Sequence, residues 1–347
     1  MKKASKAIAL ILCMILCISV LTACSKDEGD GKDNGKASDG EVIELTLGHI
    51  YSTNHNEAEA LQQLAENLDK ASNGRIKLTI YPSSAMGSER EMAEQVSLGT
   101  LDMALSDGPT WSNTLNIPEM AVFGLPFLYN GIDGEVACYE TIIENSREFM
   151  KDSGVYPLFC TSASIRGAML TTKPINSISD IHDIKMRVPE ISMYVDTWKN
   201  LGANATATAW SECYTSLSSG VVDGCEADPS TLVDANIQEV TKYFSQTNHM
   251  GTIHIISINQ NKWNSIPEDL QQIILDECAK ISASQAESRK VADAAAIEAM
   301  EKAGITVNAI TDEARAEMIA AEQPLYDQYA KDYNLGELIN TLKELGK

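Results

Sequence analysis

Arg166 and Arg187 are the residues whose type and spacing best suit chemistry in this chain. They lie 21 positions apart, each in or beside a short apolar segment typical of a strand. Proteins with alternating strands and helices place ligand contacts at strand ends that face a crevice. A guanidinium there can hold a carboxylate through two parallel hydrogen bonds. The pair therefore predicts a binding site for a small anion.

Four further arginines support a different interpretation. Arg90, Arg147, Arg289 and Arg315 fall in helical stretches that are rich in Glu. Arginine and glutamate one helical turn apart commonly pair on a solvated helix face. We predict surface ion pairs for these four side chains.

The sequence lacks the common catalytic and metal-binding motifs. It contains no G-x-S-x-G, H-E-x-x-H, Walker A or G-x-G-x-x-G segment. Among its five histidines, only His49 with His55 and His249 with His254 lie close together. Two histidines without a third ligand in register are typical of ordinary polar positions. We predict no catalytic residue, no metal site and no cofactor.

The charge balance excludes two classes of partner. The 347 residues carry 27 Lys and Arg against 49 Asp and Glu, a formal net charge of −22. Nucleic acid and anionic lipid both need a positive surface, which this composition does not provide. The hydrophobic content of 44% is enough for a folded core. An anionic ligand must then be captured by a local arginine site.

The N-terminus has the pattern of a lipoprotein signal. Lysines precede an apolar run over residues 7–20, which is too short for an ordinary membrane span. Leu21-Thr22-Ala23-Cys24 resembles the lipobox of bacterial lipoproteins. We predict a signal peptide over 1–23, lipidation of Cys24, and a flexible acidic tether over 24–40. The folded body would then be anchored outside the cytoplasm, at the cell surface or in the periplasm.

Five cysteines remain after the signal and Cys24. None forms a C-x-x-C pair, so neither a zinc site nor a dense disulfide framework is indicated. The pattern favours buried free thiols and leaves one bridge open. The five are Cys138, Cys160, Cys213, Cys225 and Cys278.

Hydrophobic periodicity predicts an α/β fold. Strands over 42–48, 75–81 and 101–106 alternate with helices over 57–72 and 88–98, the second opening on a capping box at Ser88. This order is typical of parallel strands with right-handed crossovers.

A second unit with the same alternation follows. The sequence predicts strands over 155–160, 165–171, 185–188, 221–225 and 253–258, helices over 192–201, 211–218 and 231–239, and long helical patterns over 267–302 and from 311 onward. Two hinged α/β lobes fit this order, with several crossings of the chain between them. We assign 41–164 with about 253–292 to lobe I, and about 165–252 with 293–347 to lobe II and the C-terminal helices.

Short motifs along both units resemble one family. The first unit contains Asn73-Gly74-Arg75, Tyr81-Pro82, Leu98-Gly99-Thr100-Leu101-Asp102 and Leu125-Pro126-Phe127-Leu128. The second contains Pro174-Ile175, Lys185-Met186-Arg187-Val188, Val222-Asp223-Gly224 and Thr247-Asn248-His249. In order and spacing they resemble the DctP-like solute-binding proteins of TRAP (tripartite ATP-independent periplasmic) transporters, over about residues 43–345.

The resemblance implies a two-lobe binding protein, not an enzyme. Such a protein has a hinge, a long interlobe helix and a cleft that closes around a small organic acid, sugar acids included. It hands the ligand to a membrane permease that is driven by an ion gradient. We expect the chain to act in this way as a monomer.

The resemblance also implies roles for individual residues. Arg187 matches the arginine that pairs with the ligand carboxylate, and Arg166 matches a second arginine near it. Trp210 stands where an aromatic ring packs over the ligand. Glu89 and Asp107 match acceptors for ligand hydroxyls.

One segment departs from the family pattern. Members often carry Gln-Glu-Asn-Pro after Val-Asp-Gly, with the Asn on the carboxylate, whereas this chain has Cys225-Glu226-Ala227-Asp228. Ala227 cannot donate a hydrogen bond. Either another donor replaces that contact, or Asp228 takes a ligand hydroxyl or amine.

Two other function classes are weighed against this one. The same lobes could present a ligand to a chemoreceptor or sensor kinase. A lipid-anchored hydrolase would need a nucleophile and a base that converge in the crevice, and no motif supports it.

Overall fold

The computed structural model describes residues 41–347, apart from the side chains of Ser162 and Ala163. The predicted signal, the Cys24 anchor and the tether therefore lie outside the described residues. None of the helices in the described part combines the length and the apolar composition needed to cross a bilayer.

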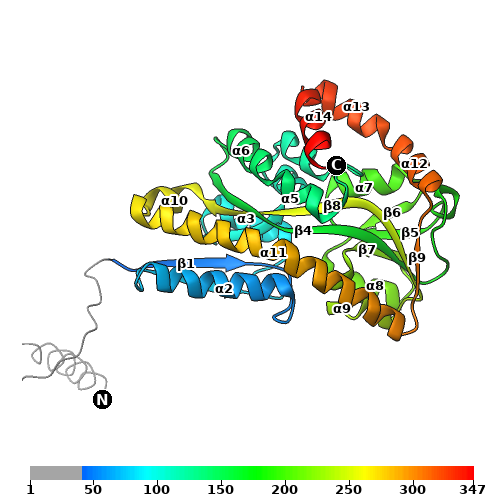
Figure 1. The fold of residues 1–347 in the computed structure, drawn as a ribbon, viewed down its shortest axis with the longest axis horizontal. Helices are drawn as coiled ribbons and strands as arrows, with labels where there is room; N and C mark the ends of the chain where they lie inside the picture. Colours follow the sequence, from blue (N-terminus) through cyan, green and yellow to red (C-terminus); the bar gives the residue numbers. More distant parts are fainter. Residues whose placement is uncertain (1–40) are drawn as a thin grey trace, which may run out of the picture. The chain divides into compact units, whose positions relative to one another are not determined.

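One mixed sheet runs through the described chain (Figure 1). Its order is β2-β1-β3-β8-β4-β7-β5-β6, and β9 pairs with β8. We call the β1–β3 end lobe I and the β5–β7 end lobe II. The strands are β1 Ile43–Gly48, β2 Ile76–Tyr81, β3 Met103–Asp107, β4 Val155–Leu170, β5 Lys185–Val188, β6 Asn204–Ala207, β7 Gly224–Ala227, β8 Tyr243–Asn259 and β9 Thr306–Ala309.

Lobe I confirms the alternating pattern predicted for residues 42–106. Strand β1 pairs in parallel with β2 and with β3, and helices α2 (Asn56–Ala71) and α3 (Glu89–Leu98) connect them. The capping box at Ser88 is present, and Gly99 ends α3 with a φ of 76°. These caps place Glu89 in the first turn of α3, beside the C-terminal end of β3.

Strands β4 and β8 cross between the lobes, and they are much longer than predicted. Each was predicted from shorter apolar segments, 155–160 and 165–171 for β4 and 253–258 for β8. In β8 the polar residues Ser245, Thr247 and His249 interrupt the apolar pattern, yet all three are buried. Their side chains are hydrogen-bonded inside the protein, so the strand continues where hydropathy predicts its end.

Shorter helices cover the sheet between and beyond these strands. Their bounds are α4 Gly108–Leu115, η1 Pro118–Gly124, α5 Gly131–Ala137, α6 Tyr139–Phe149, η2 Ile178–Asp180, α7 Ser192–Asn200, η3 Trp210–Glu212, α8 Cys213–Ser218, α9 Pro229–Asp234, η4 Ile237–Glu239 and α10 Gln260–Ser265. Helix α7 matches the predicted segment 192–201 closely, whereas the segment predicted as one helix over 231–239 divides into α9 and η4. Helices α7 and α9 carry Tyr194 and the Asp228 cap to the space between the lobes.

Helix α11 (Glu268–Lys302) spans both lobes, as Figure 1 shows. It packs on α2 in lobe I, on β4 in the centre and on α9 in lobe II. The helical pattern predicted from residue 311 onward divides into three helices. These are α12 Asp312–Ala321, α13 Gln323–Asp332 and α14 Gly336–Leu345. Pro324, in the first turn of α13, has no N–H and cannot continue α12.

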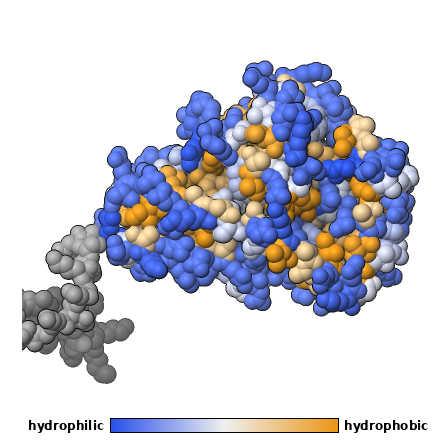
Figure 2. All heavy atoms as spheres, viewed as in Figure 1, coloured by the Kyte–Doolittle hydropathy of each residue, from blue (hydrophilic) through white to orange (hydrophobic). Residues whose placement is uncertain are grey.

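Buried apolar side chains of the described residues form three clusters. One cluster joins β1 and α2 to the first half of α11, and another joins β7 and α8 to its end. A third and larger cluster lies on α3 to α7 and the C-terminal helices. The face in Figure 2 is mostly hydrophilic, as the acidic composition predicts. The predicted two-lobe α/β fold is confirmed, while its residue boundaries stay a prediction.

Candidate functional site

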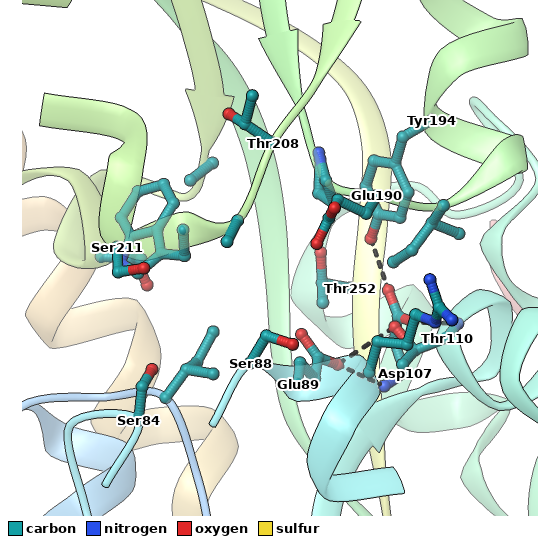
Figure 3. A pocket seen from close by; sticks show the side chains of 18 of the residues that line it. Ser84, Ser88, Glu89, Asp107, Thr110, Glu190, Tyr194, Thr208, Ser211 and Thr252 are labelled. Atoms are coloured by element: carbon teal, nitrogen blue, oxygen red, sulfur yellow. Dashed lines mark hydrogen bonds between the residues drawn. The ribbon is translucent and has the colours of Figure 1, made fainter. Parts of the chain in front are cut away.

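A pocket lies between the two lobes, and all six predicted ligand residues line it. It encloses about 790 Å³, the open space at its mouth included, a size typical of small-molecule sites. Figure 3 shows side chains that meet from both lobes, with Ser84, Ser88 and Glu89 opposite Glu190 and Thr208. The six predicted residues are Glu89, Asp107, Arg166, Arg187, Trp210 and Asp228.

Arg187 brings a buried positive charge to the pocket. It lies on β5 and is only 2% exposed. Its Nε and Nη2 both donate to the carbonyl oxygen of Thr208, at 3.1 and 2.5 Å, and its guanidinium lies 5.3 Å from the centre of the Trp210 ring. None of the described Asp and Glu side chains is within ion-pair distance of it. Its Nη1 has no described protein acceptor, so that nitrogen is free for a ligand.

Arg166 is held differently, because a buried carboxylate already pairs with it. Its Nε and Nη2 donate to the two carboxylate oxygens of Glu226, the second at 2.8 Å, and Nη1 donates to Thr252 at 3.1 Å. Burial raises the pKa of Glu226, but the Arg166 charge and a hydrogen bond from His249 outweigh it and lower the pKa below its ordinary value. The charge of Arg166 is therefore neutralised inside the protein, and no local sequence signal predicts this pairing.

Glu89 and Asp107 form one hydrogen-bonded group on the lobe I side. Asp107 caps α4 and accepts from Thr110 N at 2.7 Å and from the Tyr194 hydroxyl at 2.5 Å. Glu89 accepts from Asp107 N at 3.1 Å and from the Thr110 hydroxyl at 3.2 Å (Figure 3). Burial and the nearby Asp107 charge raise the pKa of Glu89 to about 8. A protonated Glu89 can donate a hydrogen bond as well as accept one.

Asp228 is tied to an arginine that was interpreted as a surface residue. Its carboxylate caps α9 through Thr231 N at 2.9 Å and pairs with Arg289 Nη2 at 2.8 Å. Arg289 is fully buried and also lies 3.7 Å from Asp293. The predicted surface ion pair at Arg289 is therefore wrong. The Glu-rich sequence around it is typical of a solvated helix, but α11 packs this face against both lobes.

Of the other three arginines predicted to form surface ion pairs, one forms such a pair and two do not. Arg90 pairs with Glu94 at 3.0 Å on the surface, which confirms the prediction. Arg147 instead donates to the carbonyl oxygens of Pro157 and Leu158. Arg315 donates to a backbone carbonyl of β8 and lies over Phe127. Neither of these two makes the predicted ion pair with a neighbouring acid among the described residues.

Two buried polar atoms of the pocket lining have no described partner. Ala227 lines the pocket, and its methyl side chain has no hydrogen-bond donor. The Thr208 hydroxyl and His254 Nδ1 are buried in the pocket lining without a described partner. Burial lowers the pKa of His254 to about 4, so its ring is neutral at pH 7.

The described residues contain no cluster of three or more His, Cys, Asp or Glu side chains arranged to hold a metal ion. The five cysteines at positions 138, 160, 213, 225 and 278 are free and buried, which confirms the prediction of buried thiols.

A family comparison accounts for this combination of fold and pocket. The family described as bacterial extracellular solute-binding protein, family 7 (DctP), matches residues 47–332. The chain belongs to this family. The resemblance to DctP-like proteins of TRAP transporters is thereby confirmed. Because the family is extracellular, this solute-binding protein acts outside the cytoplasm.

Three relatives show how far the similarity extends. A solute-binding protein of Roseobacter denitrificans is 30% identical over 237 residues, 68% of this chain and 72% of that protein. The sialic acid-binding periplasmic protein SiaP of Vibrio cholerae is 27% identical over 85% of this chain and 90% of its own length. A TRAP periplasmic solute-binding protein of Xanthobacter autotrophicus, solved with bound β-D-galacturonate, is 28% identical, with a TM-score of 0.81 over 86% of this chain and 99% of that one.

The titration of Glu89 should make the stability of this solute-binding protein depend on pH. Its pKa rises from 4.5 to about 8 on folding, so between these values the folded state holds a proton that the unfolded state has lost. The contribution of Glu89 to stability therefore falls as pH rises from about 4.5 to 8. Glu89→Gln keeps the accepting oxygen and cannot titrate. Urea unfolding at pH 5.5, 7.0 and 8.5 should show a shallower decline for the variant, and parallel profiles would contradict the assignment.

Proposed function

We propose that this protein captures a small carboxylate, most suitably a sugar acid, and delivers it to the permease of a TRAP transporter. The buried Arg187 in the pocket carries the proposal. A desolvated guanidinium without a protein carboxylate is costly unless a ligand anion compensates it. Because Nη1 is free and Nη2 lies beside it, the site can present two donors to one carboxylate.

The other charges in the pocket favour one carboxylate and several hydroxyls. Arg166 is neutralised by Glu226, and the exposed Arg90 is paired with Glu94. This leaves Arg187 as the pocket-lining arginine without a described acidic partner. Glu89, Asp107 and Asp228, together with the Thr208 hydroxyl, offer acceptors and donors for hydroxyl groups. A second ligand carboxylate would lie among these acids, so we favour a hydroxylated monocarboxylate over a dicarboxylate.

Ligand capture would draw the predicted lobes together. We propose residues 41–164 with 253–292 as lobe I and 165–252 with 293–347 as lobe II. Two hydrogen bonds between these segments support closure. The Tyr194 hydroxyl donates to Asp107, and the Ser52 hydroxyl donates to Asp234 at 2.6 Å.

A thermal-shift screen followed by calorimetry tests the function. The compounds are D-galacturonate, D-glucuronate, D-gluconate, succinate and neutral D-galactose. A ligand that binds only the folded state raises the Tm. We expect the sugar acids to raise it most and galactose to leave it unchanged. A shift by galactose with none by any carboxylate would overturn the proposal, and recovery of chemically altered ligand would show an enzyme.

We further propose that Cys24 carries a lipid and that residues 25–40 tether the body to the outer face of the cell membrane. Cys24→Ala should release the exported protein from the membrane fraction, because the lipid chains supply the apolar area that holds it there. Ser25→Ala is the matched control and should stay bound. Fractionation and labelling with a radioactive fatty acid measure both properties. Membrane retention of the Cys24→Ala protein would refute the anchor.

A further inference from the structure

A second groove lies on lobe I, and it shares no lining residue with the pocket that holds Arg187. One side of the groove is α2, and the other side is formed by residues at the ends of β1 and β2. Figure 1 shows α2 alongside β1 in this part of the molecule. The groove encloses about 750 Å³, the open space at its mouth included, which is enough for a small molecule.

Two carboxylates line this groove without a positively charged partner. Glu59 and Glu66 are exposed on α2 and lie two helical turns apart, about 10 Å along the helix axis. No Lys, Arg or His side chain among the described residues is within ion-pair distance of either carboxylate. Gln62 lies between them on the same helix face and adds an amide oxygen that can accept a hydrogen bond. The lining of the groove is therefore negatively charged.

A buried histidine is an independent sign that the groove takes a ligand. His49 lines the groove, its side chain is fully buried, and neither ring nitrogen has a described hydrogen-bond partner. Its backbone N–H donates to the Tyr81 carbonyl oxygen at 3.1 Å, so the pairing of β1 with β2 continues through His49. Side chains alternate along a strand. The His49 ring therefore lies on the same face as Leu45 and Leu47, which α2 covers.

The His49 ring can accept a hydrogen bond from an ammonium group. Burial lowers the pKa of His49 to about 4, so the imidazole is neutral at pH 7 and one of its nitrogens is an acceptor. Buried polar groups are normally hydrogen-bonded, and a bound donor would satisfy this one. Ala58, Ile80 and Pro82 add apolar surface to the lining. The groove thus combines negative charge, an unused acceptor and apolar contact area.

We propose that this groove binds a small organic dication, an extended aliphatic diamine. One ammonium group would pair with Glu59 and the other with Glu66, because the spacing of the two carboxylates suits two charges rather than one. His49 would accept from one of these ammonium groups, and the methylene chain would lie on the apolar lining. The described residues contain no cluster of three or more His, Cys, Asp or Glu side chains arranged to hold a metal ion, which favours an organic cation.

Titration calorimetry of the full-length protein tests the site with three probes of equal chain length. They are 1,5-diaminopentane, 1-aminopentane and the neutral 1,5-pentanediol. The titrations are made at low ionic strength, because both glutamates are exposed and salt screens their charges. We expect saturable binding of the diamine, weaker binding of the monoamine and no binding of the diol. An excess of D-galacturonate should leave the diamine affinity unchanged, because the two sites share no lining residue.

Three variants and one control assign the binding to the groove. Glu59→Gln and Glu66→Gln should each weaken diamine binding about fivefold, the loss expected for an exposed ion pair. His49→Phe keeps a ring in the buried space, has no acceptor, and should also weaken binding. Glu317→Gln removes the same charge from an exposed position on α12. This matched control should bind the diamine as the wild type does.

Several results would overturn the proposal. One is the absence of saturable diamine binding, and another is equal affinity for 1-aminopentane, which has the chemistry of a single lysine side chain. Equal weakening by Glu317→Gln would show a general counter-ion effect only. Because Glu59 and Glu66 are exposed, their variants should fold and decide the question even if His49→Phe does not. None of these results bears on carboxylate capture.

Discussion

Replacing Arg187 by alanine is expected to weaken carboxylate binding by about 2–5 kcal/mol, or about 30- to 4,000-fold in Kd. The reason is that Arg187 supplies the buried positive charge that lacks a described acidic partner in the pocket. The variant would leave a ligand carboxylate desolvated without its counter-charge. Titration calorimetry with the best sugar acid from the screen measures the loss.

Two comparisons distinguish a binding role of Arg187 from a structural one. Arg90→Ala removes another arginine from the pocket lining, but that side chain is exposed and paired with Glu94, so affinity should change little. Arg187→Ala removes an uncompensated buried charge, but it also removes the hydrogen bonds to the Thr208 carbonyl and the contact with Trp210. A lower Tm without ligand is therefore compatible with both roles, and the affinity of the folded variant decides between them. Unchanged affinity in this variant, with a lowered Tm, would show a structural role instead.

Replacing Arg289 by methionine is expected to destabilise the fold by about 3–5 kcal/mol. Arg289 is fully buried, and its partner Asp228 is 3% exposed at the N-terminus of α9. Methionine fills much of the space but leaves the Asp228 carboxylate buried without a counter-charge. Urea unfolding at pH 7 measures the change in the free energy of unfolding.

A second substitution tests this cause directly. Asp228→Asn retains a side-chain oxygen that can cap α9 and removes the charge. The double variant Arg289→Met with Asp228→Asn should therefore recover part of the lost stability. Arg90→Met is the matched surface control and should cost at most about 1 kcal/mol. A loss for Arg289→Met as small as that of the control would contradict a buried ion pair.

The sequence by itself determined the local structure and identified some of the residues that line the pocket. Helix caps, glycines that end helices and hydrophobic periodicity all depend on residues that are close together in the chain. The α3 capping box and the parallel strands of lobe I could therefore be predicted. Strand-end positions and family-like motifs were sufficient to select six of the side chains that line the pocket. These signals are local in the chain, and the structure preserves them.

Only the tertiary structure decided which charges remain available to a ligand. Arg166 and Glu226 are 60 positions apart, and Asp228 and Arg289 are similarly distant, so no local spacing predicts either pair. The same holds for β8, where the buried Ser245 hydroxyl donates to Asn308, which lies 63 positions away in the chain. Whether a charge is neutralised depends on the groups that folding brings within hydrogen-bond distance of it. Two arginines with similar sequence surroundings therefore differ: Glu226 compensates the charge of Arg166, whereas Arg187 has no acidic partner among the described residues.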